Sequence, residues 1–431
     1  MPRFTNSLLI IATALLFSAC AMQSNQQSAM ETEQEKEFKA KLAKCENNNA
    51  ESCFELGGML LNAGRSDDKE KMLDSEMLFA SSMFFMQSCE LNHGDGCLMF
   101  ATTLLLGELN ESFLKSKQND YQSLTDKISK ENLDIYMKYI KKSCELDSAN
   151  GCDELGRAYF NGDNVKKDEK LGFFYRKKGC DLAQNRHKDD RYYAGRAGGI
   201  GCARVGLMYY NGDGVAKNRQ LALKYFDRGC GVLGEHCGNY VRWFYEGYNG
   251  KIIKVPQDYE FAFKLAQRGC ETNNNESCNY LGILYLEGKG VAQDIKKAFW
   301  TFYELCYKKP DSRIPIPKKS GAFVYIPDNA DYKKLGCYNL ALRYANGQGT
   351  EQNYKRAFGM FQKLCDEDEM GGACGMVGNY YYDAKGIRQD YSSALHYFGK
   401  ACDLGEQSGC DNHKMMKRNP YAYGLRESDF R

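Results

Sequence analysis

The sequence predicts an all-α protein, an α/α solenoid of about eight helical hairpins. Of its 19 cysteines, 18 fall into nine consecutive pairs, and five of these pairs are eight residues apart. The step from one pair to the next is 28 residues at five places, so the two spacings add to a period of 36 residues. A fixed period in this range is typical of repeat proteins in which each unit packs against its neighbours.

The residues after each cysteine pair predict the first helix of a hairpin. An apolar and then a small residue stand three and four positions after the second cysteine, as at Leu155-Gly156, and a large apolar residue such as Tyr159 stands seven positions after it. These offsets place the three side chains on one face of a helix. Ten positions after the cysteine a glycine can end the helix in a left-handed conformation. These glycines are Gly107, Gly162, Gly212, Gly247, Gly288 and Gly347.

The second helix of each hairpin is predicted to begin twelve residues before the next cysteine. Aspartate or asparagine occupies this position, and both residue types cap helix N-termini well. Inside the helix an alanine and a phenylalanine, such as Ala222 and Phe226, lie eight and four residues before the cysteine on the same face. The expected capping residues are Asp168, Asn218, Asp258, Asp294, Asn353 and Asp390.

The hairpins are expected to form one array over residues 39–418, with a C-terminal tail over 419–431. Eight full hairpins run from Cys53 to Cys402, a lone helix before them ends at Cys45, and a lone helix after them starts at Cys410. The closing helix has His413-Lys414 where internal repeats have an apolar and a small residue. Polar residues at this place are expected for the cap of a solenoid.

The sequence resembles Sel1-like repeats, which are relatives of the tetratricopeptide repeat, at Ala-Cys-Asp-Leu-Gly-Glu-Gln-Ser-Gly-Cys (401–410), Leu-Gly-x-x-Tyr (155–159) and Asn-Gly-x-Gly-Val (211–215). With its paired cysteines the chain is similar, over roughly residues 40–412, to the secreted subgroup named Helicobacter cysteine-rich proteins. The resemblance implies an α/α superhelix whose helix pairs are stapled by disulfides. It also implies a hydrolase alternative, because some members of the subgroup are described as penicillin-binding or β-lactamase proteins.

On this resemblance, the paired cysteines are expected to form nine disulfides that leave only Cys20 outside the pairs. Export would supply the oxidising compartment that such bonds require. Zinc is a poor alternative, because paired zinc ligands usually have two to four residues between them and most of these pairs have seven. We expect no metal and no cofactor. The expected bonds are Cys45-Cys53, Cys89-Cys97, Cys144-Cys152, Cys180-Cys202, Cys230-Cys237, Cys270-Cys278, Cys306-Cys337, Cys365-Cys374 and Cys402-Cys410.

The N-terminus predicts export. Residues 1–19 have the pattern of a signal peptide, with a positive charge before a short apolar run from Leu8 to Phe17. Ser18-Ala19-Cys20 resembles a bacterial lipoprotein cleavage box, in which Cys20 would carry the lipid and residues 20–38 would form a lipidated N-terminus and flexible tether. Ordinary cleavage after Ala21 would give a soluble product instead. We therefore expect an outer-membrane or periplasm-facing lipoprotein, with a soluble periplasmic or secreted protein as the alternative.

Candidate catalytic motifs are scattered along the chain. Ser112-Phe-Leu-Lys115 and Ser66-Asp-Asp-Lys69 match the Ser-x-x-Lys pattern of penicillin-recognising enzymes, and Ser148-Ala-Asn150 and Lys319-Ser-Gly321 superficially match the other two motifs. Those enzymes place the lysine-glycine motif on a sheet strand beside the nucleophile, which a helical array does not offer. We therefore name no catalytic residue and favour a protein that is not an enzyme; if it is one, the resemblance implies a β-lactamase-type hydrolase. With 58 Lys and Arg against 56 Asp and Glu, the chain also lacks the charge excess that favours a nucleic-acid partner.

The longest insertion into the repeat, Tyr307 to Gly336, holds four of the chain's seven prolines. Its apolar stretch is either decoration on neighbouring helices or a recognition loop. The candidate contact residues are Ile314, Ile316, Phe323, Tyr325 and Ile326. We predict an exported repeat scaffold that binds a protein or peptide in its concave groove at the cell envelope, with the N-terminal lipid in the membrane. The alternatives are a penicillin-binding or β-lactamase-type hydrolase and a cell-wall glycan-binding module.

Overall fold

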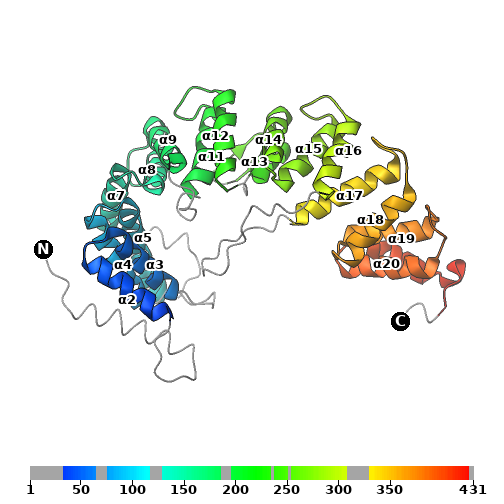
Figure 1. Ribbon diagram of the computed structural model, residues 1–431, viewed down its shortest axis with the longest axis horizontal. Helices are drawn as coiled ribbons and strands as arrows, with labels where there is room; N and C mark the ends of the chain where they lie inside the picture. The colour runs from blue at the N-terminus through cyan, green and yellow to red at the C-terminus, as the bar shows by residue number, and fades with distance from the viewer. Residues whose placement is uncertain are drawn as a thin grey trace, which may run out of the picture. The chain divides into compact units, whose positions relative to one another are not determined.

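The computed structural model describes residues 33–64, 75–116, 129–185, 196–233, 237–250, 254–307 and 330–426. In these ranges almost all regular structure is helical, and consecutive helices pack against each other as hairpins (Figure 1). The chain divides into two compact units, Met1–Val232 and Leu233–Arg431. The predicted fold class, an all-α array of disulfide-stapled hairpins, is confirmed.

The first unit is built from helices that pack in chain order, α3 on α4, α4 on α5, α5 on α7, α7 on α8 and α8 on α9. Its elements are α2 (Glu33–Glu46), α3 (Ala50–Ala63), α4 (Ser75–Glu90), α5 (Gly94–Ser116), α7 (Lys130–Glu145), α8 (Ala149–Asn161), α9 (Glu169–Asn185), the π-helix η1 (Arg196–Gly201), α11 (Cys202–Asn211) and α12 (Arg219–Leu233).

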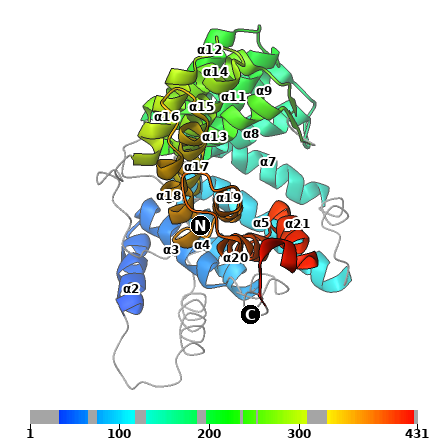
Figure 2. The ribbon, with the colours of Figure 1, turned by 90° about the vertical axis from the view of Figure 1, so that its right-hand side faces the viewer.

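The second unit continues the same order. Its elements are α13 (Cys237–Glu246), β1 (Tyr248–Asn249), β2 (Lys254–Val255), α14 (Tyr259–Glu271), α15 (Asn275–Glu287), α16 (Ile295–Tyr307), α17 (Ala330–Asn346), α18 (Tyr354–Asp366), α19 (Gly371–Asp383), α20 (Tyr391–Asp403), α21 (Gln407–Arg418) and the 3-10 helix η2 (Pro420–Tyr423). The first helices of adjacent hairpins also touch, α13 with α15 and α15 with α17. Figure 2 shows α19, α20 and α21 side by side near the C-terminus.

The short strands β1 and β2 pair in antiparallel register, with Tyr248 opposite Val255. They lie between Cys237 and Cys270, a step that is longer than the usual 28 residues, and no strand is predicted there from the sequence. Val255 is buried, so this small hairpin also contributes to the core of its unit.

The predicted capping residues begin the second helices, as expected. In each case the side-chain oxygen accepts a hydrogen bond from the backbone N–H three residues later, at 2.8–3.1 Å. This bond satisfies an amide that would otherwise have no partner inside the helix. The capping residues are Asp168, Asn218, Asp258, Asp294, Asn353 and Asp390.

Five of the six predicted stop glycines follow the end of a first helix, and all five have positive φ: Gly162, Gly212, Gly247, Gly288 and Gly347. The prediction is wrong at Gly107, which lies inside α5, a helix that continues to Ser116. The residues that follow Gly107, such as Glu108, Leu109 and Glu111, favour helix.

The second glycine of the recurring turns is required by packing between hairpins. Gly214 has a φ of +68°, and a Cβ there would collide with the backbone carbonyl of Glu169 at the start of α9. Gly290 has a φ of +71° and meets the backbone of Tyr259 at the start of α14 in the same way. These glycines therefore let each turn rest on the second helix of the preceding hairpin.

Small residues on the first helices allow phenylalanine rings of the second helices to fill the core. A Cβ at Gly206 would lie 2.9 Å from the Phe226 ring, and a Cβ at Gly378 would lie 2.6 Å from the Phe398 ring. Both rings are almost completely buried. Small residues and aromatic rings therefore pack directly against each other, and larger side chains here would force the two helices apart.

The ends of the array differ from the prediction. Helix α2 begins at Glu33, inside the predicted tether over 20–38, because Phe38 packs in the core of the first hairpins. At the other end the predicted tail folds back, and Leu425 is buried against Met416 and neighbouring residues of α20. The last core is thus covered by apolar contacts as well as by the polar residues of the closing helix.

Candidate functional site

Disulfides fix the junctions between hairpins. Each joins the second helix of one hairpin, or the lone first helix α2, to the next helix along the chain, with Cα–Cα distances of 4.4–4.8 Å. Cys230 and Cys237 are disulfide-bonded as well. The eight bonds with defined partners are Cys45–Cys53, Cys89–Cys97, Cys144–Cys152, Cys180–Cys202, Cys270–Cys278, Cys306–Cys337, Cys365–Cys374 and Cys402–Cys410.

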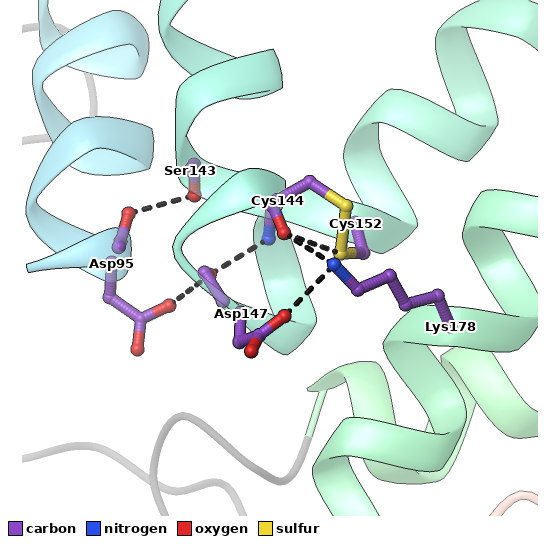
Figure 3. Close-up of a disulfide and its surroundings, with 9 residues drawn as sticks. Asp95, Ser143, Cys144, Asp147, Cys152 and Lys178 are labelled. Atoms are coloured by element: carbon purple, nitrogen blue, oxygen red, sulfur yellow. Dashed lines mark hydrogen bonds and ion pairs between the residues drawn. A yellow bond between two sulfur atoms is a disulfide. The ribbon is translucent and has the colours of Figure 1, made fainter.

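Polar side chains from neighbouring hairpins surround the bond between Cys144 and Cys152 (Figure 3). The Lys178 ammonium donates to the Cys144 carbonyl at 2.9 Å and pairs with the Asp147 carboxylate at 2.9 Å. On the opposite side, the Ser143 hydroxyl donates to the Gly94 carbonyl at 2.7 Å. The junction is therefore linked to the hairpins before and after it, which explains how a short covalent loop can organise a longer stretch of chain.

Ser148, from the predicted Ser-Ala-Asn motif, has a structural role in this junction. It is fully buried, donates its hydroxyl proton to the Asp95 carboxylate, and accepts a hydrogen bond from the Gly151 amide at 3.0 Å. It therefore caps α8 and does not serve as part of a catalytic motif. Ser112 lies on α5, while Ser66–Lys69 and Lys319–Gly321 lie outside the described residues.

The predicted lipidation residue Cys20 and the whole of residues 1–32 lie outside the described part of the chain. The same holds for the candidate recognition residues Ile314, Ile316, Phe323, Tyr325 and Ile326. Within the described ranges, no helix has the length and apolarity to cross a membrane. In those same ranges, His, Cys, Asp and Glu side chains form no group of three or more that could hold a metal ion.

In the first unit, charged side chains of α8, α9 and α11 are engaged with each other. Asp153 on α8 accepts hydrogen bonds from Arg176 on α9 at 3.3 Å and from Arg204 on α11 at 3.0 Å. Burial lowers the pKa of Arg176, and the Asp153 carboxylate opposes this shift. Since Arg204 keeps 30% of its side chain exposed, it is the part of this network that an approaching molecule can reach.

In the second unit, a row of amide and guanidinium groups crosses three successive first helices. We call Asn239, Arg242, Asn279 and Asn339 the polar row. Arg242 donates to the Asn239 amide oxygen at 2.7 Å, and Asn339 donates to the Asn279 amide oxygen at 3.0 Å. The polar row is not among the sites predicted from the sequence, although asparagine recurs one or two positions after a cysteine at Asn239, Asn279 and Asn339.

Glu276 is a buried carboxyl group beside the polar row. It is 5% exposed and accepts a hydrogen bond from the Tyr332 hydroxyl at 2.8 Å. Burial raises the pKa of Glu276, while the bond from Tyr332 and the charge of Arg242 act in the opposite direction. Gly238 provides the necessary space, because a side chain there would collide with Glu276.

Arg343 on α17 is a buried cation without a counter-ion in the described structure. It is 6% exposed, and its Nε and Nη1 atoms are enclosed with no described hydrogen-bond partner. Burial lowers the pKa of Arg343. At the equivalent position, six residues after a cysteine, the adjacent repeats have Leu284 and Tyr380, so comparison of the repeats could have singled out this residue.

An open depression of about 710 Å³ lies in the first unit. It lies between the turn after α8 and the turn after α11, and is lined by Lys167, Asp168, Glu169, Lys170, Gly212, Gly214, Val215 and Ala216. Lys167 pairs with Glu169 at 2.8 Å, and Asp168 caps α9. Three of its four charged residues, all except Lys170, are thus already engaged within the fold.

Comparison with known proteins identifies the repeat. The Sel1 repeat family matches residues 149–183, 199–230, 240–274, 275–300, 334–369 and 372–406. Helicobacter pylori cysteine rich protein B is 30% identical over 37% of this chain and 90% of its own, with a TM-score of 0.23. A Sel1 repeat protein from Oxalobacter formigenes is 19% identical over 62% of this chain and 93% of its own, with a TM-score of 0.32.

A third solved structure, the protective antigen c5321 of uropathogenic Escherichia coli strains, displays an SLR fold. It is 17% identical over 91% of this chain and 92% of its own, with a TM-score of 0.29. A search of curated proteins finds no match. Because the TM-scores are low, the assignment rests on the matched repeats and on sequence identity.

The chain belongs to the Sel1-repeat family. Proteins of this family are generally non-catalytic scaffolds for protein–protein interaction. The many disulfides of this chain also indicate a location in an oxidising compartment.

Proposed function

We propose that the protein is an exported, disulfide-rich repeat scaffold that binds a protein or peptide at the cell envelope. The junction disulfides support export, because bonds of this number persist only in an oxidising compartment. The signal-peptide pattern and the box at Cys20 support attachment through a lipid, in the outer membrane or facing the periplasm. The soluble alternative differs only in how the N-terminus is processed.

One observation supports the binding role: the packing residues of the first helices are constant, while their other side chains vary. The residues three and four positions after the cysteine are apolar and small in hairpin after hairpin. The residue two positions after the cysteine changes freely, as Glu154, Arg204, Asn239, Tyr280, Asn339 and Met376. Constant packing with variable side chains is the arrangement by which repeat proteins present an extended binding surface.

The polar row suits an extended peptide. A carboxamide side chain can donate and accept hydrogen bonds at the same time, as a peptide backbone does. Asn239, Arg242 and Asn339 are half-buried and belong to first helices that touch or follow one another. We propose that the peptide binds along this face as the predicted concave groove, and that residues 314–326 act as the predicted recognition loop.

No observation on the described residues favours the hydrolase or the glycan-binding alternative. Ser148 is committed to capping α8, and its hydroxyl proton is directed to Asp95. A serine nucleophile would instead need a base within reach and donors for the oxyanion.

The test is capture of partners from a periplasmic extract by the oxidised chain. Replacing Asn239 and Asn339 together by Ala should reduce capture of a specific partner by about tenfold, as expected when central contacts are lost. The matched control is Gln267→Ala on the exposed face of α14. Deleting 314–326 should also weaken capture while the helical circular-dichroism signal is unchanged. If the double variant and the control retain the same partners equally well, the polar row is not the binding surface.

A further inference from the structure

Helix α16 differs from the other second helices of its unit at three positions. Counted from its cysteine, Trp300 stands six residues before, Tyr303 three before and Tyr307 one after. The same positions hold Lys264, Gln267 and Glu271 in α14, Gly359, Gln362 and Asp366 in α18, and His396, Gly399 and Asp403 in α20. The repeat therefore folds without aromatic residues at these positions. Tyr303 packs partly against the core, but core packing does not account for the exposed Trp300 and Tyr307.

The rings of exposed Trp300 and Tyr307 and of half-buried Tyr303 form one surface, which we call the aromatic face. Trp300 is 56% exposed and Tyr307 is 49% exposed. The ring centroids of Trp300 and Tyr303 are 5.3 Å apart, and those of Tyr303 and Tyr307 are 4.7 Å apart. Spacings of three and four residues place these side chains on one side of the helix. The ring centroid of the buried Phe299 lies 5.3 Å from that of Trp300, so Phe299 connects Trp300 to the core.

The neighbouring hairpin extends this surface with a cation. A hydrogen bond to Tyr307 raises the pKa of Arg356 on α18, so the guanidinium lies at the edge of the aromatic face. The Arg356 guanidinium carbon also lies 4.4 Å from the ring centroid of Tyr344. The aromatic face and Arg356 thus span two hairpins whose mutual position is fixed by the intervening helix α17.

The charges around the aromatic face are mainly positive. Lys296, one turn before Trp300, is exposed, as are Lys355 and Arg356 at the start of α18. These three cations form no ion pair with a described residue, whereas Lys297 is paired with Asp294 at 3.6 Å. Glu304 is the one acidic residue within α16. A ligand with carboxylates would therefore meet unpaired cations on two sides.

We propose that the aromatic face is a docking surface for a protein segment that carries an apolar side chain flanked by carboxylates. Trp, Tyr and Arg dominate the energetic centres of protein interfaces, and exposed apolar clusters mark such interfaces. Charge complementarity selects acidic segments. It also disfavours a second copy of this chain in the same position, since Lys296 and Arg356 would then face like charges. The surface lies on second helices and is independent of the polar row.

The chain allows a direct spectroscopic test. It has two tryptophans, so Trp243→Phe leaves Trp300 as the only tryptophan reporter. The probe is a phage-displayed library of random dodecapeptides, selected on the oxidised full-length chain. We expect enriched peptides to combine Leu, Phe or Trp with neighbouring Asp or Glu, and to shift the Trp300 emission. Trp300→Lys and Arg356→Glu should each weaken binding about tenfold or more, as for hot-spot residues, and high salt should weaken it further.

Lys264→Ala, the equivalent position on α14, is the matched control and should leave peptide binding unchanged. Three outcomes would overturn the proposal: no enrichment, enriched peptides without acidic residues, or equal binding to Trp300→Lys. A Trp300 emission shift with phosphatidylglycerol vesicles but with no peptide would mean that the face contacts lipid instead. Loss of peptide binding in the Asn239/Asn339 double variant would show that the selected peptides occupy the polar row, which separates failure here from failure of the proposed function.

Discussion

Removing one junction disulfide should loosen the two hairpins that it joins while the more distant hairpins stay folded. The bond between Cys270 and Cys278 links the end of α14 to the start of α15, with a sequence separation of eight residues. Replacing both cysteines by Ala leaves the backbone path intact but frees the unfolded chain from a closed loop. Because each hairpin packs mainly on its neighbours, the effect should be local.

The expected cost follows from the loop length. For a closed loop of about nine residues, the chain-entropy model gives about 2.6 kcal/mol at 25 °C. Loss of the two sulfur atoms from a packed junction adds about 1 kcal/mol at most. The bond between Cys306 and Cys337, with a separation of 31 residues, should cost more, about 3.7 kcal/mol in the same model.

Denaturant unfolding and hydrogen exchange read by mass spectrometry measure these effects together. For Cys270→Ala with Cys278→Ala, amide protection should fall in α14, α15 and the helices packed on them, while α3 to α9 keep their protection. The reasoning is refuted if protection falls evenly in both units, or if stability does not change. A larger loss for the Cys270/Cys278 pair than for the Cys306/Cys337 pair would contradict the loop-length argument.

Three further predictions concern single residues. Arg343→Met should raise the free energy of unfolding by about 1–3 kcal/mol, because it removes a buried unpaired guanidinium; a loss of stability would show that the cation is compensated. Burial raises the folded-state pKa of Glu276, so its favourable contribution is present below the unfolded pKa and is lost as pH rises. Glu276→Gln should therefore be more stable than wild type at pH 7 and not at pH 4, as thermal unfolding would show. Cys20→Ala should move the protein from the membrane to the soluble exported fraction; an unmodified N-terminus in the wild type would contradict lipidation.

Features that depend on local chemistry could be predicted from the sequence. A capping residue such as Asp258 acts on an amide three residues away, and a glycine such as Gly288 acts on its own backbone. The recurrence of such residues at one spacing therefore predicts the hairpins and the positions at which their helices begin and end. Gly107 shows the limit of this pattern, because a glycine at the same offset is tolerated inside α5 when helix-favouring residues follow it.

Contacts between hairpins could not be predicted in the same way. Asn279 and Asn339 are 60 positions apart, and their hydrogen bond depends on how α15 and α17 are packed. The missing partner of Arg343 is likewise a property of the assembled core and not of the local sequence. The aromatic face could be predicted only in part. The sequence shows that Trp300 departs from the repeat, but only the structure shows that its side chain is exposed.

The central claim is that neighbouring cysteines staple consecutive hairpins of a Sel1-repeat scaffold. Peptide mapping of the exported protein under non-reducing conditions tests it most directly. The account predicts nine links between the nearest cysteine neighbours, including Cys230–Cys237, and no free thiol among these 18 residues. A crossed link such as Cys53–Cys89, or a thiol that reacts with an alkylating reagent before reduction, would contradict it.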